Sequence, residues 1–110
     1  MSGRDRKPAV KAATAFLKAL ANERRLLILC ALAQGERSVG EITEALGLAQ
    51  STVSARLMRL RAEGLVASRR EGRNIYYRLE RPEVAAIITL LQSAFCAPGE
   101  ALAPPRPDGG

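Results

Sequence analysis

Two short helices joined by a very tight turn are encoded near the middle of the chain, and no other feature restricts the fold as much. Ser38 is followed three residues later by Glu41, the spacing of a capping box that begins a helix. Gly47 can end that helix, and Ser51 is placed to cap the next one after the short segment Leu48-Ala49-Gln50. The pattern therefore predicts a helix-turn-helix unit over residues 38–64.

Apolar residues at helical spacing predict three further helices around this unit. The first runs from Ala9 to Ala21, and the second begins after Asn22 and ends at Gly35. Pro82 fits the first turn of a last helix that continues to about Cys96.

The hydrophobic period changes from helical to alternating after Gly64. Residues 65–70 and 74–79 are β-leaning runs, and Glu71-Gly72-Arg73 between them suits a hairpin turn. A hairpin at this position is a wing. The predicted fold is therefore mainly α with a small β-hairpin, a winged helix-turn-helix of four helices, two strands and a fifth helix.

The chain is short enough for one domain, which we expect over residues 9–96. Residues 1–8 are predicted to be a disordered basic arm, and residues 97–110, rich in Pro and Gly, a flexible tail. The start of the chain does not resemble a signal peptide, and its longest apolar run is too short to span a membrane. We therefore expect a cytoplasmic protein.

Positive charge and polar side chains gather where a helix-turn-helix meets DNA. The net charge is +6, and 14 of the 17 basic residues are arginine, which suits bidentate contacts to phosphate and guanine. The second helix of the unit should enter the major groove, with the wing gripping the backbone or minor groove. The predicted contacts to double-stranded DNA are Gln50, Ser51, Thr52, Ser54, Ala55, Arg56, Arg59, Arg69, Arg70, Arg73 and Asn74.

In combination, four segments resemble the ArsR/SmtB family of bacterial winged helix-turn-helix repressors. They are residues 22–29 (NERRLLIL), 51–57 (STVSARL), 63–66 (EGLV) and 72–79 (GRNIYYRL). The resemblance covers about residues 13–96. It implies a repressor, not an enzyme, that works without a cofactor and leaves its operator when an inducer acts on it.

The resemblance also implies a homodimer formed by the first and last helices, which binds inverted-repeat half-sites. The wide apolar stripe of the last helix agrees with this, because it is large for one side of a small monomer. The residues expected at the dimer interface are Phe16, Leu17, Val84, Ile87, Ile88, Leu91 and Phe95.

The sequence argues against the metal sites known in the family. One uses a Cys-x-Cys element in the third helix, but residues 37–41 contain no thiol. Another uses Asp and His on the last helix, whereas this chain has no His at all. Two cysteines are too few for a closed four-ligand zinc site. No metal is therefore expected, although a metalloid site with both thiols and a third ligand stays open.

Cys30 and Cys96 are the remaining candidates for sensing. A free cysteine is often an ordinary buried hydrophobic residue, and that interpretation competes here. The two positions, with Phe95 before the second cysteine, resemble the sulfide- and persulfide-responsive (SqrR/BigR-like) branch of the family. This implies a dithiol switch in which reactive sulfur species link Cys30 to Cys96 and release DNA, controlling sulfide-detoxification genes. Arg24 and Arg25, which precede Cys30, are candidates to favour its thiolate.

Besides the metalloid site, four alternatives stay open at this point. The same thiols suit a general peroxide or disulfide sensor, or a virulence-type activator. A thiol oxidoreductase fits poorly, because the chain lacks both a Cys-x-x-Cys motif and a histidine. The last helix would also suit a protein-interaction module.

Overall fold

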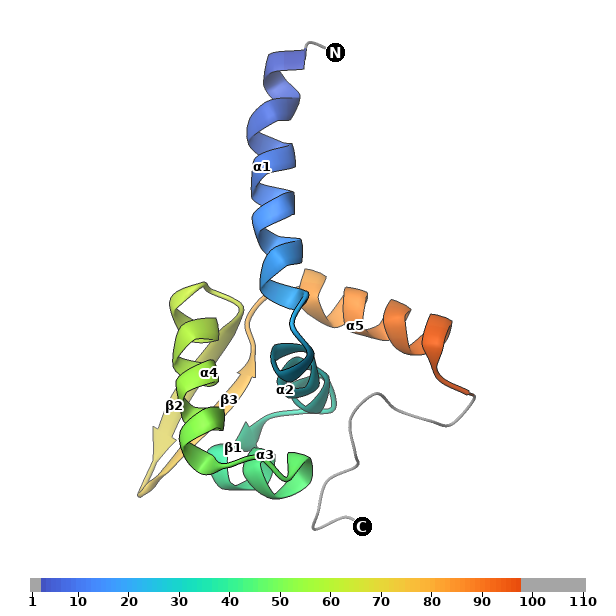
Figure 1. Cartoon of the computed structure of the whole chain (residues 1–110). Helices are drawn as coiled ribbons and strands as arrows, with labels where there is room; N and C mark the ends of the chain where they lie inside the picture. Colours follow the sequence, from blue (N-terminus) through green and yellow to red (C-terminus); the bar gives the residue numbers. More distant parts are fainter. Residues whose placement is uncertain (1–2, 98–110) are drawn as a thin grey trace.

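The computed structural model describes residues 3–97, in which five helices surround a three-stranded antiparallel sheet (Figure 1). The elements are α1 (Gly3–Leu20), α2 (Glu23–Ala33), β1 (Arg37–Ser38), α3 (Val39–Leu46), α4 (Gln50–Ala62), β2 (Val66–Glu71), β3 (Asn74–Leu79) and α5 (Pro82–Phe95). This confirms the predicted winged helix-turn-helix. Most of the predicted tail, residues 98–110, lies outside the described residues, as do residues 1–2.

The wing is the β2–β3 hairpin, and a strand that the sequence did not predict joins its other edge. The strand order is β1-β3-β2. Glu71 pairs with Asn74, so Gly72 and Arg73 form a two-residue turn, and Gly72 has φ +63°, in the left-handed region that favours glycine. On the opposite edge Ser38 pairs with Tyr76, which connects the wing to the start of α3.

The core forms around α2, which packs against α1, α3, α4, α5 and β3. Residues 28–32 of α2 are all buried, an unbroken run that fits a helix covered on several sides. The apolar stripe predicted on α4 is confirmed, because Val53, Leu57 and Leu60 are fully buried. This contact fixes which face of α4 points to solvent.

The predicted capping box is confirmed, but the predicted cap of the next helix is wrong. The Ser38 hydroxyl accepts a hydrogen bond from the Glu41 amide, and the Glu41 carboxylate accepts one from the Ser38 amide. After Gly47, α4 begins with Ala49 as its N-cap, because the Val53 amide already donates to the Ala49 carbonyl. Ser51 therefore lies in the first turn, and its hydroxyl does not cap the helix.

Helix α1 begins earlier than the sequence predicted. It includes Gly3–Pro8, which we expected to belong to a disordered arm. The residue before Ala9 is a proline, which cannot cap a helix there, whereas Arg, Lys and Ala around it favour continuation.

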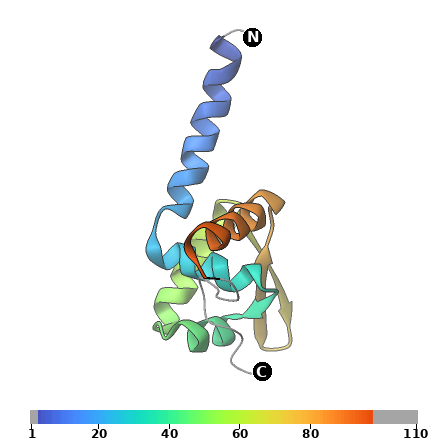
Figure 2. The same cartoon turned by 90° about the vertical axis from the view of Figure 1, so that its right-hand side faces the viewer.

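The same helix stands away from the rest of the protein (Figures 1 and 2). The radius of gyration, 15.2 Å, accordingly exceeds the ~13 Å typical of a compact chain of about 100 residues. From Lys7 to Lys18 every side chain except Phe16 is exposed. A helix with so little packing is marginal on its own in water, so α1 gains stability when something covers it.

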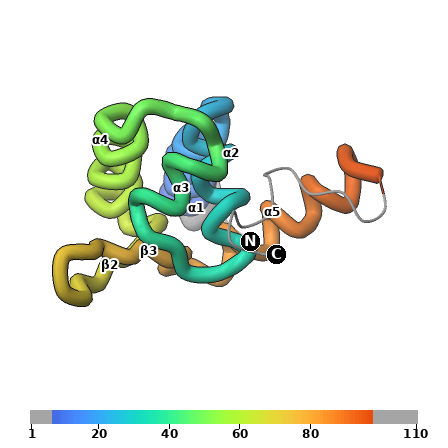
Figure 3. The backbone as a smooth tube through the Cα atoms, turned by 90° about the horizontal axis from the view of Figure 1, so that it is seen from below, coloured from blue at the N-terminus to red at the C-terminus, as the bar shows by residue number. Residues whose placement is uncertain are grey.

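Helix α5 extends from the sheet in the direction opposite to the wing (Figure 3). Two residues expected in the dimer interface, Val84 and Ile88, are fully buried within this chain, so their assignment was wrong. They pack into the protomer's own core because α5 lies across α2. Hydrophobic periodicity marks a buried face but does not say which chain covers it.

Candidate nucleic-acid interface and cysteine pair

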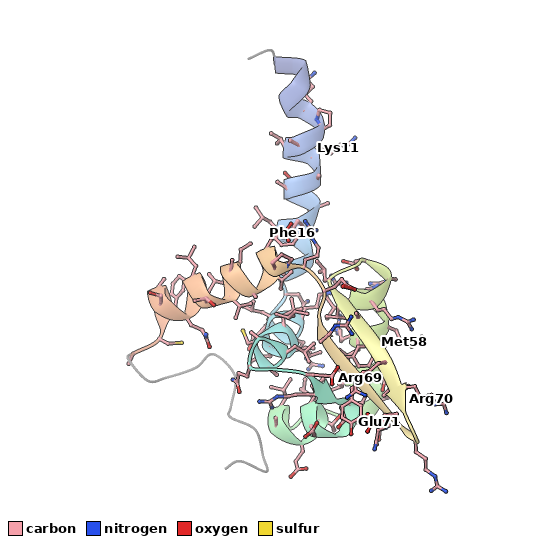
Figure 4. All side chains as sticks on the ribbon, turned by 180° about the vertical axis from the view of Figure 1, so that it is seen from behind. Lys11, Phe16, Met58, Arg69, Arg70 and Glu71 are labelled. Atoms are coloured by element: carbon pink, nitrogen blue, oxygen red, sulfur yellow. The ribbon has the colours of Figure 1, made fainter. Side chains whose placement is uncertain are left out.

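The solvent-facing side of α4 carries polar side chains because its opposite side is the buried stripe. Gln50, Ser51, Ala55 and Arg59 are exposed, and Thr52, Ser54 and Arg56 are partly buried. All seven were predicted to contact DNA, and the helix brings them together on one surface. Met58, also exposed, points outward from the same helix (Figure 4).

Two hollows flank α4 and divide these residues between them. One, of about 520 Å³, lies between α4 and the start of α2, and its lining residues are Arg24, Ser51, Thr52, Ala55, Arg56 and Arg59. The other, of about 320 Å³, lies between α4, the start of α3 and the wing, and it is lined by Ser38, Val39, Gly40, Gln50, Ser54, Arg73, Asn74 and Ile75. Of the predicted DNA contacts, only Arg69 and Arg70 line neither hollow.

Arg69 has a structural role that the sequence did not predict. Its guanidinium donates to Glu36, with an N–O distance of 2.7 Å, forms a second ion pair with Glu71, and lies 4.7 Å from the centre of the Tyr76 ring. The hydrogen bonds from Arg69 hold the pKa of the Glu36 carboxyl below its usual range. Through these contacts Arg69 ties the wing to the segment after α2, while its side chain stays 44% exposed and its contact with DNA stays a prediction.

Arg70 and Arg73 remain at the solvent-facing end of the wing. Successive residues of a strand point to opposite faces, so Arg70 lies on the other side of the hairpin from Arg69 and Glu71 (Figure 4). Arg70 Nε donates to the carbonyl of Gly72 at 3.3 Å, and both arginines are exposed. Contact of these two side chains with the backbone or the minor groove of DNA stays a prediction.

The two cysteines lie on helices that pack against each other, and both are free thiols. Cys30 in α2 is 1% exposed, whereas Cys96, the C-terminal cap of α5, is only partly buried. Burial raises the pKa of the Cys30 thiol to about 11, and the negative charge of the Cys96 thiolate adds to the rise. The two thiols are therefore close enough to interact electrostatically, although the cysteines are far apart in the sequence.

The expectation that Arg24 and Arg25 favour the Cys30 thiolate was wrong, because the pKa of Cys30 is raised. The Arg25 guanidinium instead pairs with Glu63 at 3.2 Å and donates to the Ala19 carbonyl at 3.3 Å. Arg24 lines the hollow beside α4. Both side chains belong to other parts of the structure.

Residues 3–97 lack the features of a metal site and of a membrane span. That part of the chain has no group of three or more His, Cys, Asp or Glu side chains placed to hold a metal ion. None of its helices is both long and apolar enough to cross a membrane.

The exposed apolar residues lie mainly on α1 and α5. Leu17 and Phe95 are 56% and 77% exposed, as expected for an interface with another chain. Phe16 and Ile87 pack partly against the core, Phe16 beneath the guanidinium of Arg81. Val10 and Leu90 are similarly exposed, at 61% and 66%, but were not among the residues predicted for the interface.

Arg24, Glu36 and Tyr76 are the other residues that the sequence prediction missed. Arg24 meets α4 across a gap of more than twenty residues in sequence, and Glu36 meets Arg69 across a gap of more than thirty. Local pattern contains no signal for contacts at such separations.

Comparison with known proteins agrees with this geometry. A family model described as "Bacterial regulatory protein, arsR family" matches residues 22–68. The transcriptional activator HlyU of Vibrio cholerae is 49% identical over 76% of this chain and 78% of its own length. The biofilm growth-associated repressor of Agrobacterium fabrum is 48% identical over 79% and 74% of the two chains.

Solved structures extend the similarity to three dimensions. Reduced HlyU from Vibrio cholerae has a TM-score of 0.81 at 44% identity, covering 86% of this chain and 99% of that one. The transcriptional repressor BigR from Xylella fastidiosa has a TM-score of 0.79 at 36% identity, covering 88% and 99%. The homodimeric winged helix-turn-helix DNA-binding domain from Mycobacterium bovis has a TM-score of 0.70 at 48% identity, covering 86% and 89%.

Proposed function

Because the chain belongs to the arsR family of bacterial regulatory proteins, a family of transcriptional regulators and not of enzymes, we propose that it is a thiol-controlled repressor. DNA binding and homodimerisation are typical of this family. The chain binds an inverted-repeat operator of sulfide-detoxification genes and leaves it when reactive sulfur species link Cys30 to Cys96.

The observation that carries this proposal is that Cys30 lies in α2 and Cys96 at the end of α5, two helices that pack against each other; the charge of Cys96 also contributes to the raised pKa of Cys30. If each cysteine were only an ordinary buried hydrophobic residue, there would be no reason for the two to lie near each other. Here the only two cysteines of the chain, far apart in sequence, lie on neighbouring helices. The resemblance to BigR, a repressor, and to HlyU, whose reduced form has been solved, supports a redox-responsive pair.

The different burial of the two thiols sets the order of the reaction. Cys96 is the accessible nucleophile, whereas Cys30 is buried and its raised pKa keeps it protonated near neutral pH. The Cys96 thiolate attacks the outer sulfur of a persulfide R–S–SH, which forms Cys96–S–SH and releases R–S⁻. Persulfidation gives Cys96 a sulfur–sulfur bond that a second thiol can attack.

Cys30 then completes the link. Its sulfur attacks Sγ of Cys96, forming Cys30–S–S–Cys96 and expelling hydrosulfide, which takes up the proton that Cys30 loses. In sum, one persulfide oxidises two thiols to a disulfide and yields RSH and H₂S. When both cysteines are persulfidated first, attack of one terminal sulfur on the other persulfide expels H₂S and leaves a trisulfide.

Closure of the link acts on DNA binding through the position of α5. A sulfur bridge imposes tight limits on the distance between the cysteines it joins, so it fixes the end of α5 against α2. Helix α5 also carries exposed Leu90 and Phe95, which with Val10 and Leu17 of α1 form the proposed dimer surface. Moving α5 changes how the two protomers meet, and with it the spacing of their α4 helices.

Operator release by the wild type and by Cys30→Ser and Cys96→Ser variants tests the proposal. Fluorescence anisotropy with labelled operator is measured after treatment with a persulfide or with peroxide, and the protein is then analysed by mass spectrometry. We expect persulfide to release only the wild type. Its mass should fall by two hydrogens for a disulfide, or rise by one sulfur less two hydrogens for a trisulfide. Release of either variant by persulfide would refute the dithiol switch. Release of the wild type by peroxide alone would favour a general oxidant sensor.

A second candidate function, activation, rests on the relative HlyU, which is described as an activator. A promoter fusion in cells with and without the gene distinguishes the two. Repression predicts higher reporter expression without the gene, and activation predicts lower expression.

A further inference from the structure

Half of the residues that line the hollow between α2 and α4 are arginines, and they come from both helices. Arg24 comes from the first turn of α2, whereas Arg56 and Arg59 lie on successive turns of α4. The hydroxyl residues Ser51 and Thr52 complete the lining near the start of α4. This volume, about 520 Å³, is open to solvent on the side that α4 presents.

The charges of these three arginines are not neutralised by a carboxylate, in contrast to those of the arginines that form ion pairs. Arg25 pairs with Glu63, Arg69 with Glu36 and Glu71, and Arg81 with Glu83. In the part of the chain that the structure describes, by contrast, the side chains of Arg24, Arg56 and Arg59 have neither a hydrogen bond nor an ion pair. Like charges around one hollow repel one another, so this arrangement favours an anion within it.

The hollow on the other side of α4 has a different chemistry. Gln50, Ser54 and Asn74 contribute neutral donors and acceptors, and Arg73 is its single arginine. Amide and hydroxyl groups of this kind read base edges, whereas guanidinium groups bind either guanine or phosphate oxygens with two parallel hydrogen bonds. Three guanidinium groups around one hollow, with no amide side chain among its lining residues, favour the anionic phosphate. The two flanks of α4 are thus specialised for different parts of a DNA duplex.

We propose that the hollow lined by Arg24, Arg56 and Arg59 binds a phosphodiester group of the DNA backbone, and that Arg24 of α2 is a DNA contact in its own right. This inference rests on the proposed DNA-binding function. Arg24 lies outside the helix-turn-helix and outside the wing, so it adds a third point of attachment. It holds the backbone on one side of α4 while the other side faces the bases.

The dependence of operator affinity on salt gives a direct test. Loss of one phosphate contact lowers the slope of log K against log salt concentration by about 0.9, so a symmetric dimer without Arg24 should lose about 1.8. Because phosphate contacts carry no sequence information, Arg24→Ala should weaken binding to operator and to unrelated DNA by the same factor. Arg24→Lys should restore the slope, since it keeps the charge.

Lys11→Ala is the matched control, because it also removes one exposed positive charge per protomer but lies on α1, far from α4 (Figure 4). Its slope should equal that of the wild type. An unchanged slope in Arg24→Ala would overturn the proposal, as would a selective loss of operator binding, which would make Arg24 a base contact. If the wild type bound no DNA at all, the proposed function itself would fail.

Inorganic phosphate distinguishes a backbone contact from a site for a small anion. At constant ionic strength, phosphate should displace the operator no better than chloride does. Stronger competition by phosphate that disappears in Arg24→Ala would assign the hollow to a free anion and would overturn the DNA assignment.

Discussion

Cys30 should react more slowly with electrophiles than Cys96, and the raised pKa of Cys30 sets the size of the difference. With a pKa of about 11 in place of the ordinary 9.0, its thiolate fraction near neutral pH falls about 100-fold, since only the thiolate is nucleophilic. A more basic thiolate is intrinsically more reactive, by about 10-fold for two pKa units. The two effects leave Cys30 roughly 10-fold slower than an ordinary thiol before its burial is considered.

Alkylation with iodoacetamide measures this difference. The Cys96→Ser variant is labelled in its native state and in concentrated guanidinium chloride, and Cys30→Ser is labelled natively for comparison. Native Cys30 should react at least about 10-fold more slowly than the same residue in the unfolded chain, and burial should enlarge the factor. Equal rates in the two states would refute both the raised pKa and the assignment of Cys96 as the first nucleophile.

The same pKa has a consequence for stability that serves as an independent readout. The thiol of Cys30 ionises near pH 11 in the folded chain but near 9.0 when unfolded, so the folded state retains its proton over this range. The stabilisation from the buried neutral thiol is complete below about pH 9 and is lost as pH rises through about 11. Cys30→Ala should lack this part of the pH dependence. Parallel stability curves for the two proteins across that range would contradict the reasoning.

Three further predictions concern the scaffold and the dimer. Ser38→Ala should lower the free energy of unfolding by about 1 kcal/mol because it removes the capping box, whereas Ser51→Ala, which removes no cap, should change it by less than about 0.5 kcal/mol in urea titrations. Leu57→Ala should lower the free energy of unfolding by about 2–5 kcal/mol, whereas Met58→Ala, at an exposed position, should lower it by less than about 0.5 kcal/mol. Similar losses of stability in the two variants would mean that α4 is rotated from its described position. Phe95→Glu should weaken self-association by about 100-fold or more in sedimentation equilibrium, because two phenyl rings leave a symmetric interface; an unchanged dimer constant would place the interface elsewhere.

Local sequence pattern predicted what depends on local interactions. Ser38 and Glu41 are neighbours on the same turn, and the buried stripe of α4 repeats with the helical period, so both follow from spacing alone. The hairpin followed from two alternating runs and one glycine. The cysteine pair was identified through the family resemblance, and the structure adds that one thiol is buried and the other is accessible.

Long-range contacts account for what the sequence did not predict. β1 has only two residues and exists because Ser38 pairs with Tyr76, so no period marks it. The ion pair between Arg69 and Glu36 was not predicted, because the two residues are far apart in the sequence. Val84 and Ile88 were assigned to the wrong partner, because amphipathic spacing is the same whether the covering surface belongs to this chain or to another.

The unpaired side of β2 carries a further consequence. With the strand order β1-β3-β2, β2 is an open edge, and open edges invite pairing with strands of other molecules. Here the edge is short and its outer half is charged, with Arg69, Arg70 and Glu71 in succession. Such charges discourage edge-to-edge association, so the wing's arginines also protect the protein against aggregation. Replacing these arginines together in a study of DNA binding would remove that protection. The resulting loss of soluble protein could then be mistaken for a loss of DNA binding.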